Sequence, residues 1–363
     1  MGFGIDPELF VLKSGGRLAT SIHLVKGFKS AKSYTNSSTG WVKSKTDGFA
    51  FEFTSNPTGC RDYLFPSIAN GIKDFHEQNP GYRLSAKASM KLTKASVAGS
   101  PPEGVCEYGC VPDRDGYKLI EKTPEFESYQ SMDRFTGGHI HWASGSYDSA
   151  TSALKAKRMA ALALLFDAHV AVPLVAAIGE TNDYGEALRR TYYGQAGSHR
   201  VKSYGVEYRV LSGMFLSSPF ITTWALGQVR KTATKTGPFH MLRMNDADLK
   251  VYVKGLFNTL RLDEVQDIIN NHDVKAARAY VKWTDNSTKY LPGFIEGMIR
   301  ADKAEVPINM NLLESWKMDG EKRPRARHHD YPGVEKMLYV DEMRVTNKQF
   351  PPRQLMTLED RGW

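Results

Sequence analysis

Acidic side chains recur inside apolar, strand-like segments of this sequence. In GIDPE, Asp6 and Glu8 are two positions apart, so both side chains point to the same face of an extended strand. In FAFEF, Glu52 alternates with three phenylalanines and lies on the face opposite to them. Each segment is therefore predicted to have one apolar face and one face that carries carboxylates.

Two later segments repeat this arrangement with other ligand-type side chains. His139 and His141 share a face in GGHIH, where an isoleucine separates them. Glu207 and Arg209 share a face in GVEYR, where the valine and the tyrosine take the other face. Four predicted strands thus present carboxylates, imidazoles or a guanidinium on one side only.

A divalent cation would explain why carboxylates gather in this way. Carboxylates that share a sheet face repel one another and raise each other's pKa, and a bound cation removes that penalty. Oxygen ligands suit Mg²⁺ or Mn²⁺, and an occasional imidazole is more compatible with Mn²⁺. The alternative is that each polar face is simply the solvated side of a separate antiparallel strand.

The segment 192–205, which leads into the strand with Glu207, is rich in glycine and in cationic residues. Its glycines allow the backbone to approach a ligand, and Arg200 and Lys202 can contact phosphate oxygens. The alternative is an ordinary basic loop at the entry to a strand. Metal-binding carboxylates beside arginine and lysine together predict a site for a metal–nucleotide phosphate group.

The elements that position these residues follow from hydrophobic periodicity. Strands are predicted at residues 3–12, 48–54, 82–92, 137–143 and 205–211, and helices at 60–78, 149–171 and between 219 and 301. Residues 26–47 and 93–130 are predicted to be loops. The glycine patterns of Rossmann and P-loop nucleotide sites are absent from the sequence, and strands and helices do not alternate regularly. This order favours an α+β fold around a largely antiparallel sheet.

Composition sets the broad class of protein. The chain has 363 residues, of which 41% are hydrophobic and 24% charged, and this argues against wholesale disorder. A net charge of +8 favours anionic partners. Three cysteines argue against a disulfide scaffold and favour a reducing cytoplasm.

Neither a signal peptide nor a membrane-spanning segment is expected. The first dozen residues contain acidic side chains and lack a basic start. The most apolar stretch, residues 159–179, contains Asp167, His169 and Pro173, which predict a buried helix followed by a turn. We expect Asp167 and His169 to form a satisfied buried pair rather than a functional site.

Five ordered blocks resemble the phage-type COOH–NH2 ligases (amidoligase type 2), which are assigned to the glutamine synthetase and glutamate–cysteine ligase superfamily. The blocks are GIDPE (4–8), DGFAFEFTSNP (47–57), GCVPD (109–113), RFTGGHIH (134–141) and RRTYYGQAGSHRVKSYGVEYRVLS (189–212). The resemblance implies a glutamine synthetase-like curved antiparallel sheet with helices packed on its convex side. It also implies ATP and Mg²⁺ (or Mn²⁺) on the concave face, and condensation of a carboxylate with an amine through an acyl-phosphate.

The resemblance further implies roles for individual residues. The implied metal ligands are Asp6, Glu8, Glu52, His139 and Glu207. The implied contacts to ATP phosphates or to the acyl-phosphate are His141, Arg209, Arg200 and Lys202, and the implied catalytic residues are Arg209, Glu207 and His141. The carboxylate that often accompanies Glu52 in glutamine synthetases is not obvious, because Asp47 lies five residues earlier. The number of metal ions therefore stays open.

Two further residues are candidates for substrate binding. Arg134 could hold a substrate carboxylate, although a structural salt bridge explains it equally well. Asn56 could also bind substrate, or it could be a turn residue before Pro57.

We expect residues 1–300 to form an ATP-dependent carboxylate–amine ligase domain and 301–363 to form a partly irregular, basic C-terminal extension. The expected partners are ATP, a carboxylate substrate and an amine substrate, with no membrane; nucleic acid is not favoured, and a homo-oligomer is left open. A cytoplasmic location is expected, in the host cell if the gene is a phage gene. Two other functions stay open: a non-catalytic ligase-like protein that binds nucleic acid or virions, and a phosphotransferase on the same fold.

Overall fold

A long strand, β1 (Gly2–Lys13), runs through the middle of a large antiparallel sheet in this computed structural model. Its first half pairs with β11 (Gly138–Ala143) on one side, and its middle pairs with β5 (Ala50–Ser55) on the other. β11 pairs in turn with β13 (Gly205–Tyr208). The four strands predicted to carry the ligand-type residues are therefore neighbours in one sheet.

The structure describes residues 2–13, 15–21, 24, 34–35, 42–55, 61–97, 113–122, 132–143, 152–178, 185–235, 238–288 and 311–316. Among the described strands the sheet order is β3-β4-β5-β1-β11-β13-β12-β8-β9, and β2 and β6 also pair with β1. The other strands are β2 (Leu18–Ala19), β3 (Tyr34–Thr35), β4 (Val42–Asp47), β6 (Tyr82–Ser85), β8 (Asp113–Asp115), β9 (Ile120–Lys122) and β12 (Ser198–Lys202). A separate two-stranded sheet joins β7 (Ser89–Lys91) to β10 (Asp133–Phe135).

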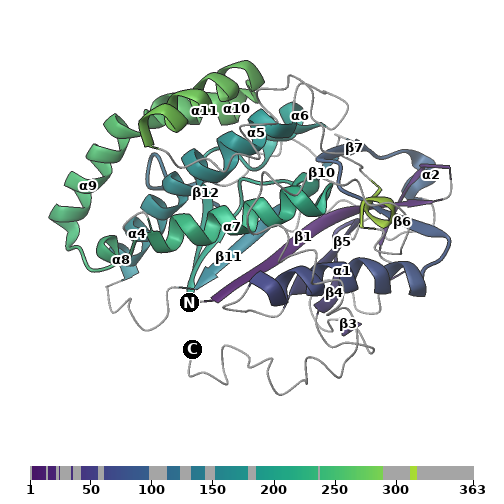
Figure 1. Ribbon diagram of the computed structural model, residues 1–363. Helices are drawn as coiled ribbons and strands as arrows, with labels where there is room; N and C mark the ends of the chain where they lie inside the picture. The colour runs from purple at the N-terminus through teal and green to yellow at the C-terminus, as the bar shows by residue number, and fades with distance from the viewer. Residues whose placement is uncertain are drawn as a thin grey trace, which may run out of the picture.

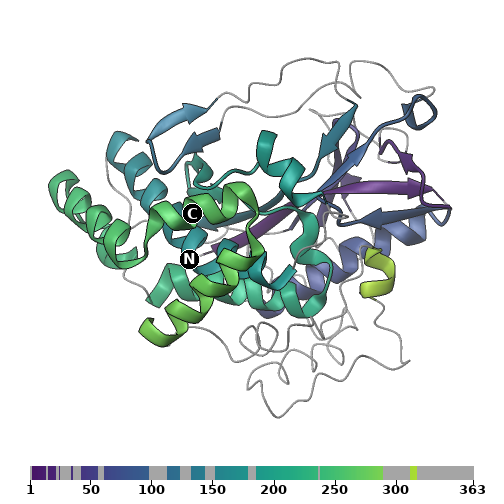
Figure 2. The ribbon, with the colours of Figure 1, turned by 90° about the horizontal axis from the view of Figure 1, so that it is seen from above.

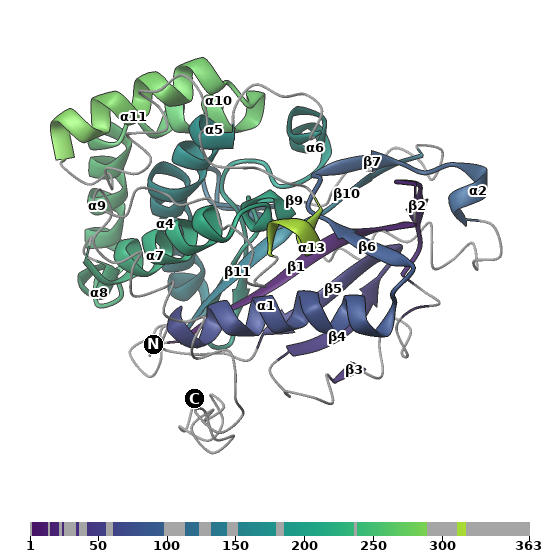
Figure 3. The same ribbon diagram turned by 45° about the vertical axis from the view of Figure 1, so that its right-hand side comes forward.

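Helices cover the apolar face of the large sheet. Their bounds are α1 (Arg61–Gln78), α2 (Lys94–Val97), α4 (Ser152–Phe166), α5 (Val172–Ile178), α6 (Glu186–Tyr192), α7 (Pro219–Lys235), α8 (Pro238–Met241), α9 (Asp246–Thr259), α10 (Leu262–Asn271), α11 (Val274–Thr288) and α13 (Leu312–Ser315). Helix α1 runs along β1, β4 and β5, and α4 contacts β12 and β13 (Figures 1 and 3). Viewed from above in Figure 2, the purple β1 extends to the right and the green helices α9–α11 lie to the left.

Apolar side chains line up across the strands on the face that these helices cover. Ile5 pairs with Ile140, and Ile140 pairs with Tyr208; all three are fully buried. Phe51 and Phe53 of β5 lie in the same core as Ile68 and Phe75 of α1. Burial of each such side chain contributes about 1.5–3 kcal/mol, which fixes the register and leaves the polar face on the other side.

The apolar segment predicted as a buried helix is one long interrupted helix, Ser152–Ile178. It is long and apolar enough to span a membrane, but 94% of its most apolar window is buried inside the protein. The turn expected at Pro173 is absent. A π-helix at Asp167–Ala171 accommodates the proline, and the chain continues as α5. Pro173 has no N–H, and the amide of Val172 donates to the carbonyl of Asp167 five residues earlier.

Asp167 is satisfied by partners other than His169. Its carboxylate accepts hydrogen bonds from the Tyr208 hydroxyl and from the Gly197 amide, both at 2.6 Å. Tyr208 lies between Glu207 and Arg209, and Gly197 immediately precedes β12. Asp167 therefore ties the core helix to the two strands that carry the C-terminal part of the candidate site.

Several element predictions are confirmed, and three are wrong. The strands at 3–12, 48–54 and 137–143 and the helix at 60–78 agree with β1, β5, β11 and α1 within a few residues. The loop predicted at 26–47 contains β3 and β4, and the loop predicted at 93–130 contains α2, β8 and β9. The strand predicted at 82–92 is two strands, β6 and β7, which pair in different sheets. The predicted α+β class with a large antiparallel sheet is confirmed.

Replacing Asp167 with asparagine should remove a pH dependence from the free energy of unfolding. Burial raises the pKa of Asp167 to about 7, so the folded protein keeps a proton that the unfolded chain loses near pH 4. The stability that this group contributes is present below about pH 4 and is lost as pH rises to about 7. We expect the wild type to lose on the order of 4 kcal/mol relative to Asp167→Asn over that interval.

Urea denaturation of both proteins at several pH values checks this, because all other titrating groups cancel in the difference. An asparagine can still accept from the Gly197 amide and donate to the Tyr208 oxygen. A difference in stability that does not change with pH would contradict the account.

Candidate active site

The sheet face opposite the helices carries the predicted site residues on adjacent strands. The cross-strand neighbours are Lys45 with Glu52, Glu52 with Glu8, Asp6 with His139, His141 with Glu207, and Glu207 with Arg200. Side chains of directly opposite residues in an antiparallel pair lie on the same face. We call this surface, from β4 to β12, the acid face.

One group of ligand-type atoms lies at the centre of the acid face. His139 Nδ1 lies 3.4 Å from Asp6 Oδ1 and 3.6 Å from Glu207 Oε1. His141 also meets this group, because its Nε2 lies 2.7 Å from Asp6 Oδ1. Asp6, His139 and Glu207 form the first acidic group, in which one atom from each residue is within 4.8 Å of the others.

A second acidic group lies on the β4–β5 side and consists of Glu8, Asp47 and Glu52. The Glu8 carboxylate is held in place by the Gly137 amide, which donates to its Oε2 at 2.6 Å. Lys45 Nζ lies 2.8 Å from Glu52 Oε1. Asp47, five residues before Glu52 in the sequence, lies on the same face as Glu52 because the β4–β5 hairpin folds it back.

Cationic side chains border the first group on the β12–β13 side. Arg209 forms an ion pair with Glu207, and its Nε lies 2.8 Å from Asp113 Oδ1. Arg200 bridges the same two carboxylates at 3.3 Å and 3.6 Å, and Lys202 Nζ lies 2.6 Å from Glu207 Oε2. Arg200, Lys202 and Arg209 are called the basic rim.

The two acidic groups differ in their electrostatics. Burial opposes ionisation of Glu207, but Arg209 and then His139 lower its pKa to about 2. Burial likewise opposes ionisation of Asp6, yet His141 and His139 hold its pKa well below the usual value. The first group is therefore ionised and largely compensated by cations and imidazoles.

In the second acidic group, nearby positive charge offsets the negative charge of the carboxylates only in part. Burial raises the pKa of Glu52 well above its usual value, and the charge of Asp6 adds to the rise, which Lys45 only partly offsets. Burial also raises the pKa of Glu8, against the effect of His139. Ionising the carboxylates between β1, β4 and β5 therefore costs free energy in the metal-free protein.

The donor chemistry of both groups fits a hard divalent cation. Each offers carboxylate oxygens, and the first adds an imidazole nitrogen, with the ligand atoms within 4.8 Å of one another. Ligands on opposite sides of Mg²⁺ at about 2.1 Å are about 4.2 Å apart, so small side-chain shifts would complete either set. In the described part of the chain these are the two groups of this kind.

Four residues of the site were not identified from the sequence as functional: Asp47, Asp113, Tyr193 and Tyr204. The Tyr193 hydroxyl contacts His139 Nε2 at 2.5 Å, and the Tyr204 hydroxyl contacts His141 Nδ1 at 2.5 Å. Both tyrosines lie in the block at 189–212 that resembles the ligase family, which was the available signal. Nothing in their spacing predicts which histidine each one meets.

The structure places Arg134 in the small two-stranded sheet and not on the strands of the acid face. Arg134 is buried on β10, where its Nη1 donates to the Asp133 carbonyl at 2.8 Å and its guanidinium stands 6.0 Å from the Phe49 ring centre. These contacts are structural, and substrate binding by Arg134 stays a prediction. Asn56 lies outside the described residues, as do the three cysteines.

A buried arginine fixes the backbone around the acid face. Arg189 donates to the carbonyls of Thr136, Val210 and Leu211 at 2.6, 2.9 and 2.7 Å. Thr136 precedes β11, the strand that carries both histidines, and Val210 and Leu211 directly follow Arg209. A Cβ at Gly138 would lie 2.1 Å from the carbonyl oxygen of Ser212, so this close approach requires glycine.

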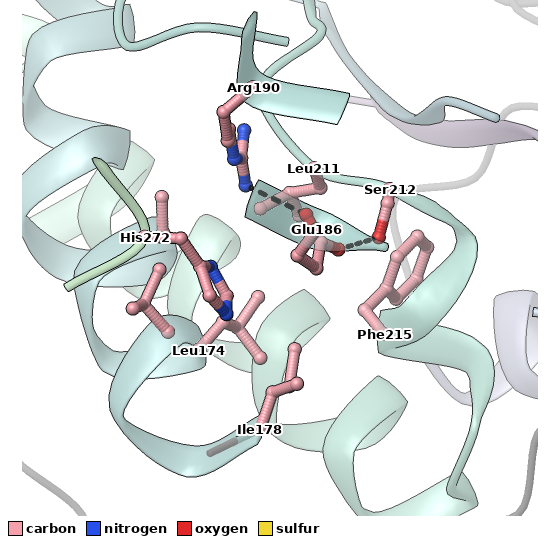
Figure 4. A pocket seen from close by; sticks show the side chains of 10 residues that line it. Leu174, Ile178, Glu186, Arg190, Leu211, Ser212, Phe215 and His272 are labelled. Carbon is pink, nitrogen blue, oxygen red and sulfur yellow. Dashed lines mark hydrogen bonds and ion pairs between the residues drawn. The ribbon is translucent and has the colours of Figure 1, made fainter. Parts of the chain in front are cut away.

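A small pocket is lined by residues of α5, α6 and the segment 211–215, together with His272. It shares no lining residue with the two acidic groups or the basic rim. Figure 4 shows the Glu186 side chain between Arg190 and Ser212, with His272 and apolar residues of α5 across the pocket. Glu186 accepts a hydrogen bond from Ser212 Oγ and lies 3.6 Å from Arg190 Nη2. These contacts hold α6 against the segment that follows Arg209.

Fold and site together define an α+β protein whose sheet presents acidic groups beside a basic rim. The phage phiEco32-like COOH–NH2 ligase type 2 family matches residues 125–306, about half of the chain, and the chain belongs to this family. It is thus a ligase of the class that forms C–N bonds. The match extends beyond residue 212, further than the sequence motifs reach, and it does not include β1, β4 or β5.

Comparison with curated proteins gives no match. Among solved structures, the chain is similar to a crystal structure of a bifunctional glutathione synthetase from Pasteurella multocida, with 10% sequence identity and a TM-score of 0.35. The alignment covers 79% of this chain and 49% of that chain, so this chain spans about half of its length. A similarity at this level carries no argument about fold or function.

Replacing Glu52 with glutamine should stabilise the metal-free protein. The amide keeps the shape and can still accept from Lys45, but it removes a buried charge that Asp6 and Asp47 repel. We expect the free energy of unfolding near pH 8, with a chelator present, to rise by about 1 kcal/mol or more.

The matched control is Glu77→Gln on α1, where the carboxylate is exposed and pairs only loosely with Lys73 at 3.6 Å. That change should leave the free energy of unfolding within about 0.5 kcal/mol. If Glu52→Gln instead destabilises the metal-free protein, nearby positive charge already offsets the carboxylates of the second group.

Proposed function

We propose that the protein is an ATP- and Mg²⁺-dependent carboxylate–amine ligase that forms an amide or peptide-like bond through an acyl-phosphate. The observation that carries this proposal is the acid face, which combines two carboxylate groups of metal-ligand geometry with the basic rim. Membership of the COOH–NH2 ligase family supports the bond that is formed. A glutamine synthetase-like architecture, with a curved sheet and helices on its convex side, is part of the same proposal.

Six residues would hold divalent metal ions: Asp6, His139 and Glu207 in the first group, and Glu8, Asp47 and Glu52 in the second. Bound there, Mg²⁺ or Mn²⁺ would neutralise charge on the nucleotide phosphates. The second group favours cation binding, because a bound cation offsets the burial and the repulsion by Asp6 that raise the pKa of Glu52.

The basic rim would bind the phosphate chain of ATP and the phosphoryl group as it transfers. Arg209 is fully buried, and Glu207 and Asp113 fix the direction of its guanidinium before any ligand arrives. Arg200 and Lys202 are less buried and can turn toward phosphate oxygens. His141, held by Tyr204 and Asp6, would contribute a further contact.

The chemistry then divides into two displacements. An oxygen of the substrate carboxylate attacks the γ-phosphorus, the bond to the β,γ-bridging oxygen breaks, and ADP leaves. The amine nitrogen attacks the carbonyl carbon of the acyl-phosphate, phosphate leaves with the bonding electrons, and the amine loses a proton. The protein's residues position these groups and stabilise the charge that develops.

The proposal also includes a division of the chain and a location. Residues 1–300 would form the catalytic domain, and 301–363 would form an extension that is not needed for nucleotide binding. The described part of that extension packs on the core, where Trp316 Nε1 donates to the Leu216 carbonyl at 2.7 Å. The protein would act in the cytoplasm, that of the host if it is phage-encoded.

Nucleotide binding tests the proposal without knowledge of the other substrates. Calorimetry should detect saturable, Mg²⁺-dependent binding of a non-hydrolysable ATP analogue to the wild type. Glu207→Gln should weaken this binding by about 100-fold or more, because it removes a metal ligand and the partner of three basic side chains.

The matched control is Asp267→Asn, an exposed carboxylate on α10, which should bind the analogue like the wild type. Equal binding by Glu207→Gln would contradict the proposed site. No binding by folded wild type would favour the non-catalytic alternative. Products then separate ligation, which gives ADP, phosphate and an amide, from phosphotransfer, which gives ADP and a phosphorylated acceptor.

Removing residues 318–363 should leave Mg²⁺–ATP-analogue affinity within about twofold of the wild type, because Trp316 and its contacts remain. The basic cluster at 322–329 is removed by this truncation, so association or solubility should change instead. Calorimetry and light scattering measure the two properties. Loss of nucleotide affinity would show that the extension completes the site.

A further inference from the structure

The hydroxyl of Tyr193 lies between two residues of the proposed site. His139 Nε2 lies 2.5 Å from the Tyr193 hydroxyl oxygen, and Arg209 Nη2 donates to the same oxygen at 2.7 Å. Tyr193 follows α6 directly and is buried. It thus joins a proposed metal ligand to the best-oriented cation of the basic rim.

Arg209 also determines which nitrogen of His139 carries the hydrogen. Its Nη1 lies 3.3 Å from His139 Nδ1, and a guanidinium can only donate hydrogen bonds. When the ring is neutral, Nδ1 therefore presents its lone pair to Arg209, and Nε2 carries the hydrogen and donates to the Tyr193 oxygen. The opposite tautomer would direct an N–H at Nδ1 toward another donor.

We infer that Tyr193 is a positioning residue that holds His139 in the Nε2–H tautomer and thereby turns the Nδ1 lone pair toward Asp6 and Glu207, where a divalent cation binds. The inference rests on the proposed function for the cation and on geometry for the tautomer. Nδ1 is the ring nitrogen that lies 3.4 Å from Asp6 and 3.6 Å from Glu207. Partners at the second ring nitrogen of a ligating histidine orient the ring and tune its basicity.

His141 shows the same principle with the nitrogens exchanged. Its Nδ1 meets the Tyr204 hydroxyl at 2.5 Å, and its Nε2 faces Asp6 Oδ1 at 2.7 Å. Each histidine of β11 therefore meets a tyrosine through one nitrogen and Asp6 through the other. The tyrosine determines which nitrogen faces the carboxylates.

Two guanidinium groups lie close to the ring of Tyr193. The guanidinium carbon of Arg189 stands 4.7 Å from the ring centre, and that of Arg209 stands 5.5 Å from it. Gly194 adopts a φ of 67°, and a Cβ there would lie 2.3 Å from Arg189 Nη1. The sequence Tyr193-Gly194 thus lets the arginine lie against the tyrosine ring.

The first arm of the test needs neither metal nor a variant of the tyrosine. Long-range ¹H–¹⁵N NMR of histidine-labelled, metal-free wild type, recorded at alkaline pH so that the imidazole ring is neutral, distinguishes the two tautomers, and His139→Asn assigns the signal. We expect His139 as the Nε2–H tautomer. An Nδ1–H tautomer of the neutral ring would overturn the inference, whatever the function proves to be.

The second arm compares Tyr193→Phe with Tyr192→Phe by titration with Mn²⁺ alone, followed by electron paramagnetic resonance. Tyr192 is the adjacent tyrosine, is 44% exposed and stacks on Phe135, so it is a matched control. Tyr193→Phe should weaken Mn²⁺ binding at the first group by about 10- to 100-fold. Tyr192→Phe should bind like the wild type.

The two arms separate the inference from the proposed function. Wild-type Mn²⁺ affinity in Tyr193→Phe would overturn the positioning role even if the tautomer is as expected. Absence of Mn²⁺ binding in the wild type, with the Nε2–H tautomer observed, would sink the metal proposal and leave the role of Tyr193 in setting the tautomer. Loss of the nitrogen coupling to Mn²⁺ in Tyr193→Phe is a signature that a merely structural residue would not change.

Discussion

The gathering of negative charge on one buried sheet face is the constraint on which the rest of this structure depends. Glu8, Glu52 and Glu207 are all buried on strands of one sheet, and nearby Asp6 and Asp47 add to the charge. The basic rim compensates the Glu207 end, whereas Lys45 compensates the Glu52 end only in part. Repulsion among these carboxylates destabilises the fold unless a bound cation offsets it. The proposed metal–nucleotide function therefore gives a reason for a charge arrangement that costs stability.

The opposite face of the sheet supplies the stability that the acid face lacks. The alternating apolar residues of β1, β5, β11 and β13 pack on helices, so the register that buries them also aligns the carboxylates across strands. Asp167 and Arg189 add polar contacts with a defined direction. Asp167 ties the core helix to Tyr208, and Arg189 holds the backbone that precedes β11 and the backbone that follows Arg209. A rigid scaffold of this kind keeps charged groups oriented before a ligand arrives.

Local periodicity was enough to predict which site residues share a strand face, but not which ones meet across strands. Asp6 with Glu8 and His139 with His141 follow from alternation along one strand. The contacts of Asp47 with Glu52, of Tyr193 with His139 and of Asp113 with Arg209 depend on hairpin and sheet register between segments 5 to 96 residues apart in the sequence. The π-helix was also missed, because the sequence shows Pro173 as a helix breaker and does not show that a wider turn accommodates it.

Anomalous diffraction from crystals grown with Mn²⁺ and a non-hydrolysable ATP analogue tests the central claim most directly. The account predicts manganese peaks between Asp6, His139 and Glu207 and between Glu8, Asp47 and Glu52, with the phosphates of the analogue between these peaks and the basic rim. A bound nucleotide elsewhere, with no manganese at either acidic group, would contradict it. The acid face would then be a structural feature of this fold and not its catalytic centre.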